Sequence, residues 1–442
     1  MGIQLPDHFN YKRLLQFTFP SMIMMVFTSL YSVVDGFFVS NFVGKTPFAS
    51  VNFIMPVLMI LGSIGFMFGS GGSALVSKTM GEGDDNKARQ LFSLFVYSTI
   101  ACGVAISVIS FIFIRPLAPL MGAEGDMLNN CVTYARILLL SLPFFMLQFE
   151  FQSFFITAEK PQLGLMVTVV CGLTNMVLDA LFMAVFSWGL VGAAAATAIS
   201  QVLGGVIPIV YFARSRSGVL WLTRTAMDGR ALVKACTNGS SELMSNISTS
   251  VVSMLYNFQL MKYAGENGIA AYGVLMYVNM IFLAIFIGYS TGVAPIVSYH
   301  YGAENHRELK GLLKKSYMII GIFAVVMLGL AELLAKPLAG IFVGYDKGLM
   351  EMTTRSFMFS SFSFLFSGIA IYGSSFFTAL NDGLTSALIS FLRSLLFQVT
   401  AVMILPMIFD IDGIWFSVVV AELAAAVMTV LFIAAKKGEY HY

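Results

Sequence analysis

The sequence has few charged residues for its length. Only 11% of its 442 residues are Asp, Glu, Lys or Arg, whereas 58% are hydrophobic, and the mean hydropathy is +0.84. A soluble domain carries about a quarter charged residues and slightly under half apolar ones. The shortage of charge therefore excludes a soluble globular protein and predicts a polytopic helical membrane protein. The net charge of +2 also lacks a basic excess, so we expect no nucleic-acid partner.

Cysteine and histidine are equally scarce. The four cysteines (Cys102, Cys131, Cys171 and Cys236) stand singly in apolar stretches without a CxxC pair, so they predict neither a disulfide framework nor a zinc site. The four histidines form no HxxxH or Ser–His arrangement, and no Walker sequence follows the glycines near Gly71. We therefore expect neither an enzyme nor an ATP-driven pump, and no cofactor apart from a coupling Na⁺ or H⁺.

Apolar runs of helical length divide the chain into twelve candidate membrane spans. They cover residues 14–43, 50–78, 91–114, 129–157, 162–186, 190–213, 235–263, 270–298, 314–335, 352–379, 384–409 and 413–434. Lys and Arg gather at one set of span ends, for example at Lys12, Arg13, Arg89 and Arg307. The positive-inside rule then places both termini in the cytoplasm, which agrees with an even number of spans.

The chain also contains an internal repeat. The stretches GGSALVSKTMGEGDDNKAR and GVAPIVSYHYGAENHRELK, which begin at Gly71 and Gly292, align at a constant offset of 221 residues. We therefore expect an all-α fold of twelve transmembrane helices in two six-helix bundles, related by a parallel pseudo-two-fold axis. The predicted parts are an N-terminal six-helix lobe (1–213), a cytoplasmic linker (214–234) and a C-terminal six-helix lobe (235–442).

Four polar residues of the first half predict an ion site. Asp35 lies deep in the first span, where a carboxylate is costly unless it is paired, hydrated or protonated. Asn175 and Asp179 share one face of the fifth span, and Thr197 lies in the sixth. Two carboxylates, an amide and a hydroxyl suit Na⁺, while two close acids can instead share a proton. We predict a Na⁺ or H⁺ coupling site, the alternative being that each acid only bonds to a neighbouring helix.

A polar stripe runs along the seventh span. Its members recur at helical spacing and are Glu242, Asn246, Thr249, Ser253 and Tyr256. A stripe of this length favours the wall of a substrate cavity, although Glu242 at the cytoplasmic mouth of the protein would simply be hydrated. The repeat offset places Tyr256 where the first half has its span-one acid, so we expect ion coupling in the first half alone.

Three further charged residues lie within predicted spans. They are Glu150 in the fourth span, Arg393 in the eleventh and Glu422 in the twelfth. An arginine at membrane depth is usually held by a carboxylate or by backbone carbonyls, so structural pairing is the better interpretation of Arg393. The sequence does not identify its partner.

Several motifs resemble the multidrug and toxic compound extrusion (MATE) family over nearly the whole chain. They are VDGFFVSNFVG in the first span, NMVLD in the fifth and GLVGAAAAT opening the sixth, together with the six-plus-six repeat. The resemblance implies that the four polar residues named above form a first-half cation or proton site. It also implies that Pro20 matches the proline at which the first helix bends when the acid is protonated. The chain departs from the family at Ala180, where a proline is common, and has no acid in residues 357–379, which leaves the coupling ion open.

These observations predict a secondary active multidrug efflux antiporter. We expect it to export organic, often cationic and amphipathic compounds in exchange for inward Na⁺ or H⁺ by alternating access. Its partners would be small-molecule substrates and membrane lipids, and it would act as a monomer in a prokaryotic inner membrane. The alternative is a flippase of lipid-linked oligosaccharide precursors of related fold, which would favour a more basic central cavity.

Overall fold

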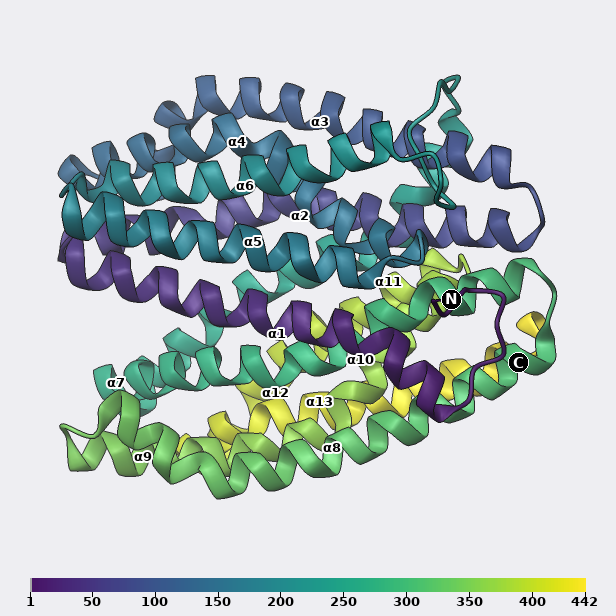
Figure 1. The fold of residues 1–442 in the computed structure, drawn as a ribbon. Helices are drawn as coiled ribbons and strands as arrows, with labels where there is room; N and C mark the ends of the chain where they lie inside the picture. The colour runs from purple at the N-terminus through teal and green to yellow at the C-terminus, as the bar shows by residue number, and fades with distance from the viewer. Residues whose placement is uncertain (1) are drawn as a thin grey trace.

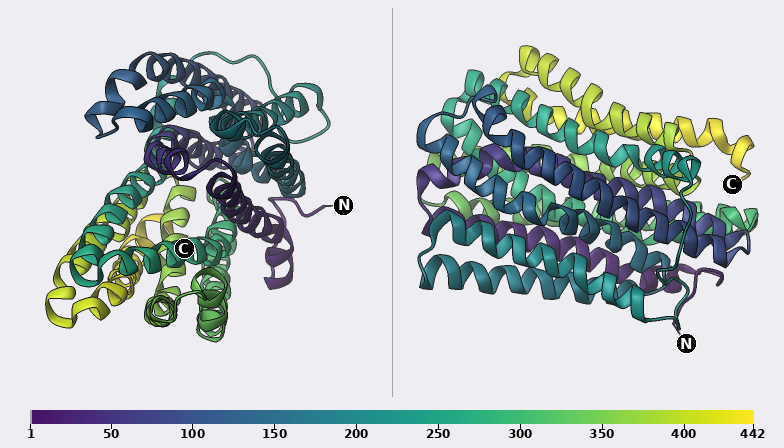
Figure 2. Two further views of the ribbon diagram at one scale, coloured as in Figure 1. Left: turned by 90° about the vertical axis from the view of Figure 1, so that its left-hand side faces the viewer. Right: turned by 90° about the horizontal axis from the view of Figure 1, so that it is seen from above.

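The computed structural model describes residues 2–442, so Met1 of the predicted first lobe lies outside it. Long helices run side by side and form two groups, one coloured purple to teal and the other green to yellow (Figures 1 and 2). The N-terminus and the C-terminus lie at the same end of the molecule (Figure 1). We call this the terminal end and the opposite one the far end.

The first lobe contains six membrane spans. Its fifth span is completed by a π-helical turn, η1, so α5 and η1 form one crossing. The elements are α1 (Tyr11–Phe42), α2 (Lys45–Gly81), α3 (Asp85–Leu120), α4 (Gly125–Thr157), α5 (Pro161–Asp179), η1 (Ala180–Val185) and α6 (Gly189–Arg214).

The second lobe contains the other six spans. Short 3-10 and π turns, η2 and η3, interrupt two of its crossings without ending them. The elements are α7 (Gly229–Gly302), α8 (His306–Val343), α9 (Lys347–Ser360), η2 (Ser361–Ser363), α10 (Phe364–Ala379), α11 (Gly383–Phe391), η3 (Leu392–Leu396), α12 (Phe397–Ile404) and α13 (Pro406–Tyr440).

Helix α7 is a hairpin of two spans. Its 74 residues would reach about 110 Å if straight, several times the thickness of a bilayer. Gly265 has non-helical torsion angles (φ 64°, ψ −152°), and the rings of Tyr256 and Tyr272 on either side of it stack with centroids 5.1 Å apart. Eleven helices of residues 2–442 are long and apolar enough to cross a membrane, and α7 holds two crossings. The prediction of twelve spans in two bundles is confirmed.

The repeat reappears in local structure. Asp84 caps α3 by accepting a hydrogen bond from the backbone N–H of Lys87 (3.0 Å), and Asn305 caps α8 by accepting one from Glu308 (3.1 Å). The two caps are separated by the same 221-residue offset as the repeated sequences. Equivalent chain positions therefore start equivalent helices in the two lobes.

Glycines bring α2 and α7 into backbone contact at the terminal end. A Cβ atom on Gly81 would overlap the carbonyl oxygen of Tyr299, and one on Gly302 would overlap that of Lys78. These two contacts are related by the repeat offset, so they lie across the pseudo-two-fold axis. Only glycine permits so close an approach, which joins the two lobes at this end.

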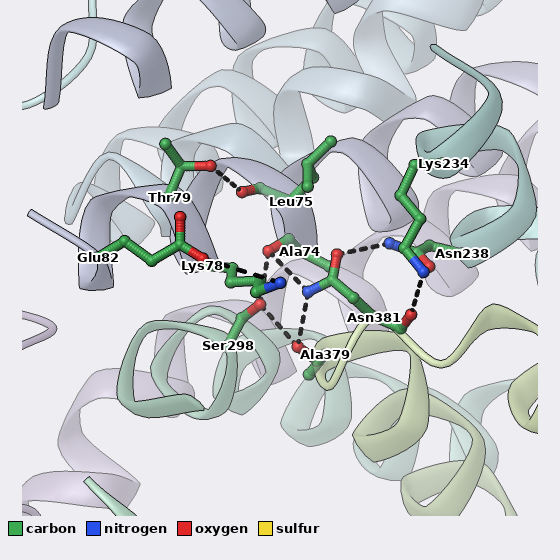
Figure 3. A network of polar contacts seen from close by, with 10 residues as sticks. All are labelled: Ala74, Leu75, Lys78, Thr79, Glu82, Lys234, Asn238, Ser298, Ala379 and Asn381. Atoms are coloured by element: carbon green, nitrogen blue, oxygen red, sulfur yellow. Dashed lines mark hydrogen bonds and ion pairs between the residues drawn. The ribbon is translucent and has the colours of Figure 1, made fainter. Parts of the chain in front are cut away.

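A polar network seals the same junction (Figure 3). The Ser298 hydroxyl lies 2.6 Å from the carbonyl oxygen of Ala74 in the first lobe and 2.7 Å from that of Ala379 in the second. The Asn381 side chain also donates to Ala74 (3.4 Å) and accepts a hydrogen bond from Asn238 (2.6 Å). The two hydrogen bonds to Ala74 cross from the second lobe to the first, so they form only while the lobes meet here.

The segment before α1 forms a strap across the terminal end. The backbone N–H of Leu5 donates to Glu159 of the first lobe (2.8 Å), and that of Phe9 donates to Glu308 of the second (2.9 Å). His8 Nδ1 lies 2.7 Å from the other carboxyl oxygen of Glu308. Both Leu5 and Phe9 are fully buried. Burial raises the pKa of Glu159, while the hydrogen bond from Leu5 opposes that change.

We predict that Gly302→Ala destabilises the protein by about 1–3 kcal/mol, because the new methyl group overpacks the contact between α2 and α7. Gly321→Ala is the matched control, because Gly321 lies in α8 with nothing within 4 Å of the added Cβ atom. The higher helix propensity of alanine should stabilise this variant by up to about 1 kcal/mol. Thermal unfolding of the purified variants measures both effects. Equal midpoints for the two variants would contradict the tight junction.

Candidate functional site

Two carboxyl groups meet inside the first lobe without a counter-charge. Asp35 of α1 and Asp179 of α5 lie within hydrogen-bonding reach of each other if one of them carries a proton. Asp179 is fully buried, and neither of its carboxyl oxygens has a hydrogen-bond donor on residues 2–442; the same holds for Oδ1 of Asp35. No Lys, Arg or His of the described chain forms an ion pair with either acid.

Local helix geometry positions the fifth-span residues. Asp179 is the last residue of α5, and the π turn η1 follows it directly. Single π turns inside longer helices occur often at functional sites, because the extra residue redirects neighbouring side chains. Asn175, one α-helical turn earlier and 3% exposed, donates from Nδ2 to Oγ1 of Thr197 on α6 (3.4 Å). The structure therefore brings all four predicted ion-site residues together.

Two tyrosines complete this pocket of the first lobe. The buried Tyr134 of α4 lies beside both acids and near the Thr197 hydroxyl. Tyr31, one turn before Asp35 on α1, lies next to that acid and to Cys171. Neither tyrosine was predicted from the sequence. Tyr31 stands one helical turn from Asp35, and that spacing is a signal for it, whereas no sequence pattern indicates Tyr134.

The oxygen atoms gathered here can serve two kinds of ion. A partly dehydrated Na⁺ takes carboxylate, amide and hydroxyl oxygens, all of which the pocket offers. A proton shared between the two acids removes the repulsion that two buried carboxylates would suffer. Either ion supplies the positive charge that the surrounding protein lacks.

A second feature is a cavity between the lobes, lined by both apolar and polar side chains. Its volume is about 420 Å³, and α1, α2 and α4 of the first lobe and α7, α10, α11 and η3 of the second line it. Glu242, Asn246 and Thr249 of the predicted stripe are on its wall. The floor residues Ala74 and Ala379 also belong to the network that seals the terminal end.

The last two residues of the stripe lie elsewhere. Neither Ser253 nor Tyr256 lines the cavity, contrary to the expectation from helical spacing. Tyr256 is 5% exposed, and its hydroxyl donates to Gln398 of α12 (3.1 Å). Beyond Thr249 the stripe therefore faces another helix of its own lobe, which sequence periodicity cannot distinguish from a cavity.

The embedded arginine has a carboxylate partner. Nε of Arg393 donates to Oε2 of Glu422 on α13 across 2.9 Å, and both side chains are largely buried. This confirms the expected structural pairing of the arginine and identifies its partner as a carboxylate. Arg393 also lines the central cavity, which the sequence did not indicate.

The other embedded acid is isolated. Glu150 of α4 is fully buried, and neither of its carboxyl oxygens has a hydrogen-bond donor on residues 2–442. Its neighbour is the equally unpartnered Thr99 hydroxyl of α3. Glu150 lines no part of the central cavity.

The acid pair and the cavity lie at different depths. Asp35 is about 24 residues into α1, or about 36 Å along the helix from the terminal end, whereas Glu242 is about 20 Å along α7. Arg393 is about 15 Å from the start of α11. The ion pocket is thus nearer the far end, and the cavity is nearer the sealed end.

Two six-helix lobes around a shared cavity, with uncompensated acids in one lobe, define a polytopic membrane transporter. The MatE family model matches residues 20–181 and 243–403, one stretch in each lobe. The multidrug export protein MepA of Staphylococcus aureus (strain NCTC 8325 / PS 47) is 24% identical over 424 residues, covering 96% of this chain and 93% of the relative.

Solved structures agree in fold. A crystal structure of MATE in complex with MaL6 superposes with a TM-score of 0.94 at 21% identity, covering 99% of this chain and 98% of the other. The outward-facing conformation of a multidrug resistance MATE family transporter of the MOP superfamily gives 0.93 with the same identity and coverage. The chain belongs to the MatE family, a family of membrane transporters.

We predict that ion binding stabilises the wild type through the acid pair. An ion present at a hundred times its dissociation constant adds about 2.7 kcal/mol to the free energy of unfolding. The unfolding midpoint should therefore rise with Na⁺ at constant ionic strength, or with falling pH if the ion is a proton, since stability gained by proton binding is present at low pH and lost as pH rises.

Asp179→Asn should abolish this response, whereas Asp126→Asn, an exposed acid at the start of α4, should retain it. Thermal scans across Na⁺ concentration and pH make the comparison. A response that survives in the Asp179 variant would show that the ion binds elsewhere.

Proposed function

We propose that the protein is a secondary active antiporter that exports organic, often cationic and amphipathic compounds in exchange for inward Na⁺ or H⁺. The observation that carries this proposal is the pair Asp35 and Asp179, two buried carboxyls without a cationic partner on the described residues. Such a pair needs a cation or a proton to be stable at membrane depth. The similarity to MepA, a multidrug export protein, supports the cargo class.

The central cavity suits the cargo. Its volume of about 420 Å³ lies in the range of small-molecule sites. Glu242 on its wall has no ion-pair partner among the described residues, so an organic cation would find an uncompensated negative charge there. Serine and threonine hydroxyls around it offer further hydrogen bonds.

Alternating access requires the terminal end to open. In this structure the glycine contacts, the Ser298 network and the strap all join the lobes there. Opening would break each of these interactions, and the strap would release either Glu159 or Glu308. The free energy of these contacts therefore favours the conformation closed at the terminal end.

Helix α1 provides a route from the ion pocket to that junction. It contains Pro20, which lacks the N–H that would bond the carbonyl of Gln16, so the helix can bend there. Directly after it, Ser21 and Met22 pack so closely on α7 that a Cβ on Gly288 would overlap their backbone. Ion binding at Asp35 would thus change the lobe contact through the same helix.

The setting follows from the orientation of the charges. Lys and Arg at the terminal end would place both termini in the cytoplasm of a prokaryotic cell, with the far end outside the inner membrane. Both proposed sites lie within one chain, so a monomer would suffice. Surrounding lipids would contact the apolar outer faces of both lobes.

The alternative function, a flippase of lipid-linked oligosaccharide precursors, has less support. It would require a predominantly basic cavity to hold a diphosphate. Here the guanidinium of Arg393 is paired with Glu422, and Glu242 adds a negative charge to the wall.

Ethidium efflux under imposed gradients tests the proposed function. We expect wild-type protein in energised cells or everted vesicles to export ethidium under either a Na⁺ gradient or a proton gradient alone. Asp35→Asn should reduce efflux to background while leaving expression unchanged, because the amide cannot hold the ion. No efflux by well-expressed wild type under either gradient would reject the drug antiporter.

A further inference from the structure

We propose that Arg393 forms an anion-binding subsite of the central cavity, so that the cavity binds organic zwitterions that carry a carboxylate as well as a cationic amine, in addition to simple organic cations. The inference rests on the proposed function, because it specifies which compounds the same cavity accepts. It depends on the hydrogen bonds and surroundings of one guanidinium.

Most donors of this guanidinium have no protein acceptor. An arginine presents five N–H donors, and Arg393 uses only Nε, which donates to Glu422. No described residue accepts a hydrogen bond from either Nη atom, although the side chain is only 19% exposed. Neither Nη atom is a buried atom without a partner, and Arg393 lines the cavity, so an acceptor inside the cavity can take the hydrogen bonds that the protein leaves open.

The unused donors adjoin the cavity. Arg393 lines it, as does the adjacent Ser394. Both belong to the π turn η3, a type of helix irregularity that is frequent at functional sites. A planar guanidinium with a neighbouring hydroxyl matches the two oxygens of a carboxylate.

The cavity therefore carries two separate charged walls. Glu242 stands on the first half of α7, while Arg393 stands on η3 and is neutralised from behind by Glu422 on α13. Glu242 and Arg393 do not form an ion pair with each other. An unpaired acid and an arginine with free donors on one cavity are complementary to a molecule whose own cation and anion are held apart.

A pair of dyes that differ only in the carboxyl group tests this subsite. Tetramethylrhodamine has a free carboxylate and is a zwitterion at neutral pH, whereas its methyl ester is a cation. Fluorescence anisotropy with the purified full-length protein measures the affinity for each dye without needing transport.

The principal variant is Arg393→Gln combined with Glu422→Gln, which removes the guanidinium without leaving Glu422 unpaired. We expect it to weaken binding of the free acid by roughly ten-fold or more, because charge-assisted hydrogen bonds to the carboxylate are lost. Binding of the ester should change by less than about two-fold. Glu242→Gln serves as the matched control, since it should weaken both dyes alike.

The outcomes separate this inference from the proposed function. If the double variant loses affinity for both dyes equally, or for neither, Arg393 has only a structural role and the subsite is rejected. If the wild type binds the ester but not the free acid, the subsite is rejected while a cation exporter stands. If the wild type binds neither dye, both the subsite and the proposed cargo cavity fail.

Discussion

The central physical constraint is that two buried carboxyl groups meet in the first lobe without a counter-charge. Asp35 and Asp179 come from different helices, and Asn175, Thr197 and Tyr134 complete their surroundings with neutral oxygens and amides. A charge at membrane depth is expensive, and two of the same sign are more so. In the proposed function a proton or Na⁺ would offset this cost while the side chains stay together, and an ion gradient would act on that requirement.

In the proposed mechanism, the rest of the fold would link the occupancy of the acid pair to the contact between the lobes. The ion pocket and the cavity are separated in depth, so ion and cargo do not need to compete for the same atoms. Helix α1 contains the acid, the flexible position Pro20 and the tight contact with α7 in one continuous element. Coupling through such an element is reciprocal: if the ion weakens cargo binding, the cargo weakens ion binding by the same factor.

Much of this structure is predictable from the sequence. Hydropathy gives the twelve spans, and the 221-residue offset gives the two lobes, because repeated glycines and helix caps leave a visible pattern. The grouping of Asp35, Asn175, Asp179 and Thr197 also follows, since each is a polar residue where the membrane penalises polarity.

The missed features are tertiary contacts. A tyrosine such as Tyr134 is common in a span, so only packing shows that it lies beside the acids. The helical stripe continues to Tyr256, but periodicity cannot reveal that α12 covers its end. Arg393 and Glu422 can both be recognised in the sequence as charges within spans. Their ion pair between η3 and α13, and the position of the guanidinium on the cavity wall, are seen only in the structure.

The most direct test of the central claim is to measure ion release when cargo binds to the purified protein. Ethidium would be added to a saturating level while a pH indicator in weak buffer, or a Na⁺ electrode, records the free ion. The account predicts release of one kind of ion from the wild type and none from a variant in which both Asp35 and Asp179 are Asn. Ethidium binding with no release of either ion, across pH and Na⁺ concentrations at which the pocket is occupied, would contradict it.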